Sequence, residues 1–141
     1  MEKSIYNTLL QQGFEPQYEP TTFTLWEGFE PITPYYDKET DKQKIKRLSE
    51  GIDTCASKIL IQKTGKIVGI RYTPDFYFKY NDLNVYIEAK GIENDVFYIK
   101  KKMFIKYLDN LYTEKGEKSI YFEVYTKKQL LQAIEIIKSY G

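Results

Sequence analysis

Histidine is absent from this sequence of 141 residues, and cysteine occurs only once, as Cys55. Without histidine the chain cannot build a Ser-His or Cys-His triad, a zinc site with histidine ligands or a histidine-metal nuclease site. A single cysteine cannot form an internal disulfide, which suits a reducing cytoplasm. Acid–base chemistry must therefore come from carboxylates, lysine, tyrosine or metal-bound water.

Long apolar runs are also missing. The sequence has no stretch of about eighteen apolar residues, and no apolar segment follows Met1-Glu2-Lys3. We therefore expect neither a membrane span nor secretion. With 42% hydrophobic and 16% aromatic residues, the chain can bury one core, so we expect a single domain over residues 1–141.

The sequence has little net charge, formally +1, so overall charge does not indicate a nucleic-acid binder. The distribution of charge is more informative. The segment 96–106 has no acidic residue and carries Lys100, Lys101, Lys102 and Lys106. We predict that these lysines contact nucleic-acid phosphates. The alternative is a solvated helix face.

The centre of the chain predicts an antiparallel hairpin. Two alternating runs, 75–80 and 85–90, flank the turn-forming pair Asn81-Asp82. Residues that face each other in such a hairpin have numbers with a constant sum, and this turn places Asp75 opposite Glu88.

The register also separates the two faces of the hairpin. Asp75, Glu88 and Lys90 share one face, and the other face is apolar: Phe76, Phe78, Val85, Ile87 and Ala89. We interpret the apolar face as core and the polar face as a site.

Two carboxylates placed opposite each other on a sheet repel unless positive charge lies between them. A divalent cation held by oxygen ligands is the simplest remedy, and Mg²⁺ is the usual one. Lys90 follows Glu88 by two residues, where its ammonium could orient a water nucleophile or stabilise charge developing on phosphate. The pattern therefore favours metal-assisted phosphodiester chemistry, with a solvated surface hairpin as the alternative.

Two motifs carry a resemblance to a known family: Tyr72-Thr73-Pro74-Asp75-Phe76 and Ile87-Glu88-Ala89-Lys90-Gly91. They resemble the PD-(D/E)xK nuclease superfamily, most of all the phage endonuclease I-type Holliday-junction resolvases and related small phage nucleases. The resemblance implies a Mg²⁺-dependent DNA endonuclease, with Mn²⁺ able to substitute, that hydrolyses phosphodiester bonds in branched DNA during recombination. If the chain is phage-encoded, it would act in the cytoplasm of the host cell.

The resemblance also implies roles for individual residues. Asp75 and Glu88 would bind the metal, the Ala89 carbonyl would add a ligand, and Lys90 would position the nucleophile. In the resembled nucleases a glutamate on the first helix contributes to the metal site, and Glu2 matches that position. Symmetric cutting of a junction would need two active sites and hence a homodimer.

Two further interpretations stay open. Transposon-end endonucleases share much of the same pattern, so transposon-end or restriction-type cleavage is the nearest enzymatic rival. From a different class, the chain could be a catalytically silent nucleic-acid-binding or defence-evasion module that keeps the fold.

The remaining elements are predicted from periodicity and cap residues. We expect a helix at 2–12, a strand at 21–27, a charged surface helix at 37–51 and a hairpin made of 58–62 and 67–72. We then expect a helix at about 95–112, capped by Asn94 or Asp95, a strand at 119–125 and a final helix. The predicted buried positions are Ile45 and Leu48 in the charged helix; Val96, Ile99, Met103, Tyr107 and Leu111 in the next; and Leu130, Ala133, Ile134 and Ile137 in the last.

A crossover through the helix at 95–112 would make the last strand parallel to the strand of Glu88. The predicted fold is a restriction-endonuclease-like α/β sandwich with a mixed central sheet flanked by helices. An inserted segment, at about 29–70, would precede the catalytic hairpin.

Overall fold

The computed structural model describes residues 1–51, 53–91 and 95–140, so Asn94, one of the two predicted helix caps, lies outside the described residues. The chain divides into two compact units. Unit 1 contains Met1–Glu27 and Ile70–Gly141, and unit 2 contains Gly28–Gly69, which is nearly the range of the predicted insertion. Within these described ranges, no helix is both long and apolar enough to cross a membrane.

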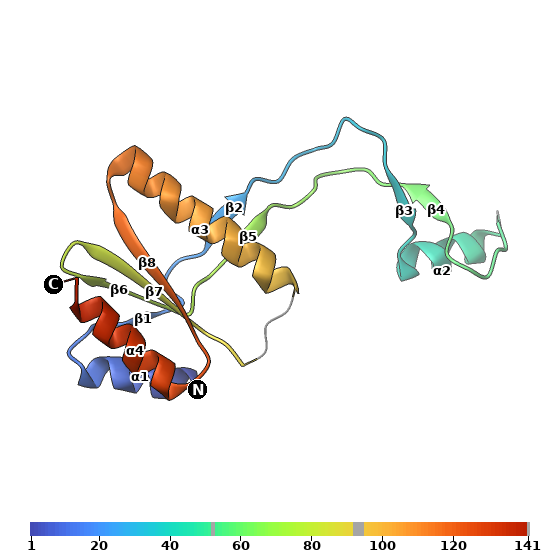
Figure 1. Ribbon diagram of the computed structural model, residues 1–141. Coiled ribbons are helices and arrows are strands. Elements are labelled where there is room, and N and C mark those ends of the chain that lie inside the picture. The colour runs from blue at the N-terminus through green and yellow to red at the C-terminus, as the bar shows by residue number, and fades with distance from the viewer. Residues whose placement is uncertain (52, 92–94, 141) are drawn as a thin grey trace. The chain divides into compact units, whose positions relative to one another are not determined.

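Unit 1 is built on a four-stranded sheet in the order β1 (Gln17–Tyr18), β6 (Phe76–Tyr80), β7 (Leu83–Ala89) and β8 (Lys118–Val124). The first three strands are antiparallel, and β8 runs parallel to β7 after a crossover through α3 (Asp95–Lys115). Figure 1 shows α1 (Glu2–Gln11) and α4 (Lys127–Lys138) beside each other and α3 apart from them. The predicted mixed α/β class with a mixed, helix-flanked sheet is confirmed.

The central hairpin has the predicted register. Phe76 pairs with Ile87 and Tyr80 with Leu83, around a turn in which Asn81 adopts φ 54°. Asparagine tolerates this left-handed conformation better than most residues, so a tight turn forms here. The register follows from the turn and from the period-2 apolar pattern, which agree with each other.

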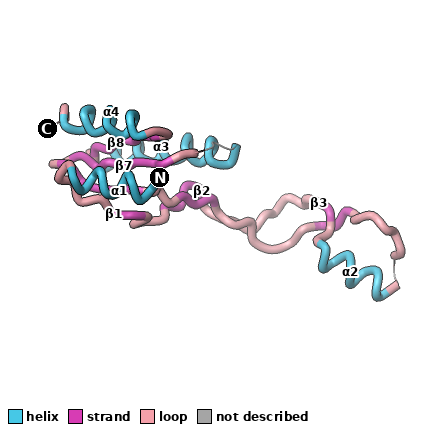
Figure 2. The backbone as a smooth tube through the Cα atoms, turned by 90° about the horizontal axis from the view of Figure 1, so that it is seen from below, coloured by secondary structure: helices cyan, strands magenta, loops and turns pink. Residues whose placement is uncertain are grey.

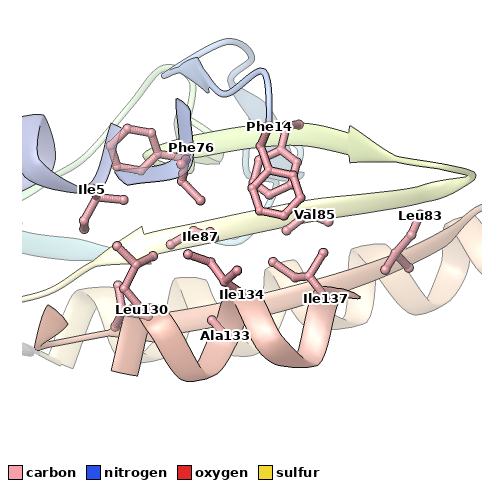
Figure 3. Close-up of a cluster of buried hydrophobic side chains, with 13 residues drawn as sticks. Ile5, Phe14, Phe76, Leu83, Val85, Ile87, Leu130, Ala133, Ile134 and Ile137 are labelled. Carbon is pink, nitrogen blue, oxygen red and sulfur yellow. The ribbon is translucent and has the colours of Figure 1, made fainter. Parts of the chain in front are cut away.

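One face of the sheet carries the predicted core. Phe76, Phe78, Val85 and Ile87 are buried there against Ile5 and Leu9 of α1 and against Leu130, Ala133, Ile134 and Ile137 of α4. Figure 3 shows this cluster, with the α4 side chains directed toward the strands. Ala89 packs against the same cluster, so the predicted apolar face and the buried positions of the last helix are confirmed.

The opposite face is not an open polar surface, as its interpretation as a site implied. It carries a second, aromatic core formed by Tyr72, Tyr86, Phe97, Phe104 and Leu108. The rings of Tyr86 and Phe104 meet edge to face, with centroids 5.1 Å apart. Glu88 lies within this layer and is only 4% exposed. The alternation of the strand showed which side chains share a face, but it could not show that α3 covers that face.

The buried face of α3 agrees with the predicted one only in part: Tyr107 and Leu111 pack against the aromatic core as predicted. Phe97, Phe104 and Leu108 point inward, whereas Val96 and Ile99 are exposed. The two phenylalanine rings remove more apolar area from water than the aliphatic pair would, so they select the helix face. The helix also runs beyond 112 to Lys115 and ends at Gly116, whose φ of 70° is readily adopted by glycine.

The two strand segments predicted at 58–62 and 67–72 do not pair with each other. Instead β4 (Leu60–Gln62) pairs with β3 (Tyr36–Lys38), and β5 (Ile70–Tyr72) pairs with β2 (Phe23–Trp26). Alternation identifies a strand without identifying its partner, and the returning chain pairs with segments that precede it. Figure 1 labels β2 beside β5 and β3 beside β4, and Figure 2 marks β2 and β3 as short magenta segments.

Unit 2 contains β3, α2 (Asp41–Glu50) and β4, and none of its described residues belongs to either apolar cluster. Ile45 and Leu48, the predicted buried anchors, are exposed, so that prediction is wrong. Among the described residues of this unit the only buried one is Glu39. Arg47 holds it: Nη2 and Nε donate to the Glu39 carboxylate at 2.6 to 3.1 Å, and Nη1 donates to the Asp53 carbonyl at 2.9 Å.

The Arg47–Glu39 ion pair therefore stabilises unit 2 in the role that an apolar core usually has. Arg47→Met should unfold unit 2 locally, because it leaves the Glu39 carboxylate buried without a counter-charge. Hydrogen exchange should accelerate across 36–62 while the amides of β7 keep their protection. Lys46→Met, at an exposed position of the same helix, is the matched control. Unchanged exchange in the Arg47 variant would contradict this account of unit 2.

Candidate metal-binding site

The two predicted metal ligands lie together at the end of the hairpin. Asp75 directly precedes β6, and its Oδ2 accepts a hydrogen bond of 2.9 Å from the backbone N–H of Ala89. Glu88 is the next-to-last residue of β7. The Asp75 carboxyl is close enough to affect the pKa of Glu88, so the register brings both acidic groups to one place.

Glu88 is the most perturbed carboxyl group here. Burial raises the pKa of Glu88 and the adjacent Asp75 raises it further, while Tyr72 and Lys90 oppose the shift, and the result is a pKa of about 8. In the metal-free protein near neutral pH, this carboxyl therefore keeps its proton.

The two oxygens of Glu88 have different environments. Oε1 accepts a hydrogen bond of 2.8 Å from the hydroxyl of Tyr72. Oε2 is buried and has no hydrogen-bond partner within the described part of the chain. An unpartnered buried acceptor is costly. A cation bound between Glu88 and Asp75 would satisfy it.

The hydroxyl groups of two tyrosines, Tyr72 and Tyr121, lie beside the Glu88 carboxyl group. The hydroxyls of Tyr72 and Tyr121 lie 3.3 Å apart, and burial raises the pKa of both phenols. Both groups therefore stay protonated, and Tyr72 remains a donor to the Glu88 carboxylate. The ring of Tyr72 packs against Phe104 with centroids 4.9 Å apart, which fixes the hydroxyl in place.

Lys90 lies at the same site. Its backbone N–H donates to the Val124 carbonyl at 2.9 Å, and its ammonium lies 3.6 Å from the centroid of the Phe97 ring. A cation over an aromatic face is attracted by the ring quadrupole, which orients this lysine. Sequence periodicity could not foresee Phe97 in this role, because it comes from α3.

A pocket of about 490 Å³ opens beside these groups. Its walls include Glu88 and Lys90, with Tyr72 and Phe97 forming apolar surface, and Arg71 and Lys100 add positive charge. Carboxylates and cations therefore meet in one concave site. This composition suits a ligand that carries negative charge and reacts with help from a metal.

Sequence reasoning missed Glu123. In the parallel ladder Glu88 pairs with Glu123, so a further carboxylate lies on the neighbouring strand. Lys101 neutralises it through an ion pair of 2.8 Å between Nζ and Oε2. A tight turn fixes the register of the two strands it joins, but a crossover helix does not. The sequence therefore could not predict that Glu123 of β8 lies beside Glu88 of β7.

The four predicted DNA-contacting lysines do not share one face of α3. Lys101 turns inward to Glu123, and Lys100 lines the pocket. Lys102 is exposed with its ammonium 4.4 Å from the centroid of the Tyr98 ring, and Lys106 is exposed as well. Contact with phosphates stays a prediction for these residues, and the position of Lys100 suits it best.

Glu2 lies in a different environment from the other predicted ligands. Its Oε2 accepts a hydrogen bond of 2.5 Å from the hydroxyl of Tyr18. Across the described ranges no group of three or more His, Cys, Asp or Glu side chains is placed to hold a metal. Asp75 and Glu88 form a pair at the hairpin, and a metal-binding role for Glu2 stays a prediction. Such a pair fits Mg²⁺, which is often held by one or two carboxylates and keeps several waters.

No protein-family model, curated protein or solved structure matches this chain. The geometry of the site therefore carries the functional argument together with the two motifs.

The raised pKa of Glu88 predicts how the metal-free protein responds to pH. The folded state binds this proton more tightly than the unfolded chain, whose glutamate has a pKa near 4.5. The contribution of this proton to the free energy of unfolding is therefore complete below about pH 4.5. It is lost as pH rises through about 8, and the free energy of unfolding falls by no more than about 1.4 kcal/mol per pH unit.

Urea unfolding in EDTA at a series of pH values between 5 and 9 measures this effect. Glu88→Gln, which cannot titrate, is the control and should show a flatter profile than the parent. Parallel profiles for the two proteins would show that Glu88 is not perturbed.

Proposed function

We propose that this chain is a Mg²⁺-dependent DNA endonuclease that hydrolyses phosphodiester bonds by attack of water. The observation that carries the proposal is the Asp75–Glu88 pair beside Lys90: Glu88 is buried, with Oε2 unpartnered in the described part of the chain, and Asp75 is partly exposed. When both groups are ionised, mutual repulsion makes this pair unfavourable unless a cation joins it; without metal the pair keeps a proton on Glu88 instead.

Each residue has a distinct role in the proposal. Asp75 and Glu88 hold Mg²⁺, with the Ala89 carbonyl as a further ligand. When bound, the metal acts as a Lewis acid on the phosphodiester and lowers the pKa of water. Tyr72 keeps Glu88 Oε1 engaged so that Oε2 faces the cation. Lys90 orients the nucleophile or stabilises the negative charge that develops on phosphate.

The charges around the pocket support a polyanionic substrate. Arg71, Lys90 and Lys100 line the same pocket as the acidic Glu88 and Asp95, so three cations face the proposed substrate there. Phosphate contacts of this kind supply affinity and position the nucleic acid without reading its sequence.

The proposed fold family and DNA substrate depend on the two sequence motifs. We propose a restriction-endonuclease-like fold, and the order of α1, the antiparallel hairpin, α3, the parallel strand β8 and α4 supports this proposal. Branched DNA, including Holliday junctions, is the proposed substrate, and a homodimer would cut both strands symmetrically. Transposon-end or restriction-type cleavage is the rival activity.

A cleavage panel tests the function. Linear duplex, single-stranded, flapped and four-way DNA are incubated with Mg²⁺, Mn²⁺ or EDTA. We expect metal-dependent cleavage, strongest on the four-way substrate. Asp75→Asn should abolish it, although the variant should fold, because the asparagine oxygen can still accept the Ala89 N–H. Lys90→Ala should lose on the order of a hundredfold or more in rate.

Lys79→Ala is the matched control, since Lys79 is an exposed lysine of the same hairpin and should be dispensable. Cleavage by Asp75→Asn at the parental rate would refute the site. DNA binding without cleavage of any substrate would favour the catalytically silent module.

A further inference from the structure

A second pocket lies on the side of unit 1 formed by α1 and β1. It has a volume of about 350 Å³ and is lined by Glu2, Lys3, Tyr6, Tyr18 and Phe76. Its walls are mainly aromatic. The ring of Tyr18 is about half exposed and lies 5.5 Å, between centroids, from the buried ring of Phe76.

The polar groups of this pocket are few and specific. The Tyr18 hydroxyl donates to Glu2 Oε2, and the carboxylate raises the pKa of this phenol, so Tyr18 stays a donor. The other oxygen of Glu2 is then available to accept from a ligand. Lys3, which is exposed, places a positive charge at the rim.

Three chemical requirements follow for a ligand. It needs a flat ring to stack on tyrosine, an N–H donor for the carboxylate and a negative charge for Lys3. A nucleotide has all three, because bases stack on aromatic side chains and cytosine offers its N4 amino group to glutamate.

The pocket is also close to the proposed catalytic site along the chain. Tyr18 pairs with Phe76 between β1 and β6, and the N–H of Glu19 donates to the carbonyl of Asp75 at 2.8 Å. Asp75 and Phe76 are consecutive, and their side chains point to opposite faces of the sheet. The two sites therefore lie at the same end of the sheet, separated by its thickness.

We propose that this pocket, across the sheet from the Asp75–Glu88 pair, binds an unpaired nucleotide of the DNA that is cut, with its base on the tyrosines and its amino group on Glu2. The inference rests on the proposed nuclease function, and it gives a physical basis for preferring branched DNA, since bases at a branch are readily unstacked. It also gives Glu2 a role in reading the base in place of the predicted role in the metal shell.

Binding to three bulged duplexes in Ca²⁺, which is expected to suppress cleavage, tests the proposal. The duplexes are identical except that the single extra nucleotide is cytosine, thymine or an abasic residue. The cytosine bulge should bind about five- to a hundredfold more tightly than the abasic bulge, the usual range for base stacking on an aromatic ring. Thymine should fall between them.

Variants then assign the effect to the pocket. Tyr18→Ala should remove most of the difference between cytosine and abasic bulges, and Tyr140→Ala, which truncates an exposed tyrosine of unit 1 outside the pocket, should keep it. Tyr18→Phe keeps the ring if the alanine variant fails to fold, and it should retain the stacking effect. Glu2→Gln should remove the preference for cytosine over thymine and leave the Mg²⁺ concentration needed for half-maximal cleavage unchanged.

Equal binding of all three bulges by the parent, with cleavage intact, would overturn this inference and leave the nuclease proposal standing. A raised Mg²⁺ requirement in Glu2→Gln with an unchanged base preference would return Glu2 to the metal site and also overturn it. Failure to bind or cleave any DNA would overturn both proposals.

Discussion

The register of the β6–β7 hairpin is the constraint on which the site depends. Phe76 pairs with Ile87. Because Asp75 precedes Phe76 and Glu88 follows Ile87, the antiparallel register places Asp75 beside Glu88. The apolar side chains buried on the other face of these strands against α1 and α4 lock that register, since a slip by one residue would turn them to the wrong face. Favourable packing on one face of the hairpin thus holds together, on the other face, two carboxyl groups that repel each other when both are ionised.

The aromatic layer under α3 gives this pair its chemistry. Burial within this layer raises the pKa of the Glu88 carboxyl, although the hydrogen bond from Tyr72 opposes the rise. The same layer supplies the Tyr72 hydroxyl to one oxygen of Glu88 and the Phe97 ring to the ammonium of Lys90. Unit 2 is stabilised differently. An ion pair between Arg47 and Glu39 holds it together, and among its described residues hardly any apolar side chain is buried.

Local patterns were sufficient to predict the features that depend on neighbours in the chain. The turn at Asn81 and the alternation on both sides of it defined the hairpin and the Asp75–Glu88 pair, and the apolar spacing in α4 defined its buried side. Features that depend on segments distant in the sequence could not be predicted from local patterns. The inward face of α3, the partners of β4 and β5 and the place of Glu123 beside Glu88 are set by packing between segments, and no turn encodes them.

We propose that the carboxylates of Asp75 and the buried Glu88 bind one divalent cation. Titration with Mn²⁺, followed by the loss of its free-ion paramagnetic resonance signal at pH 8.5, tests it most directly, because Glu88 is then largely deprotonated. The account predicts one ion per chain bound by the parent protein and by Lys90→Ala, and loss of that site in both Asp75→Asn and Glu88→Gln. Binding of Mn²⁺ by the two carboxylate variants with the affinity of the parent, or no binding by the parent, would contradict it.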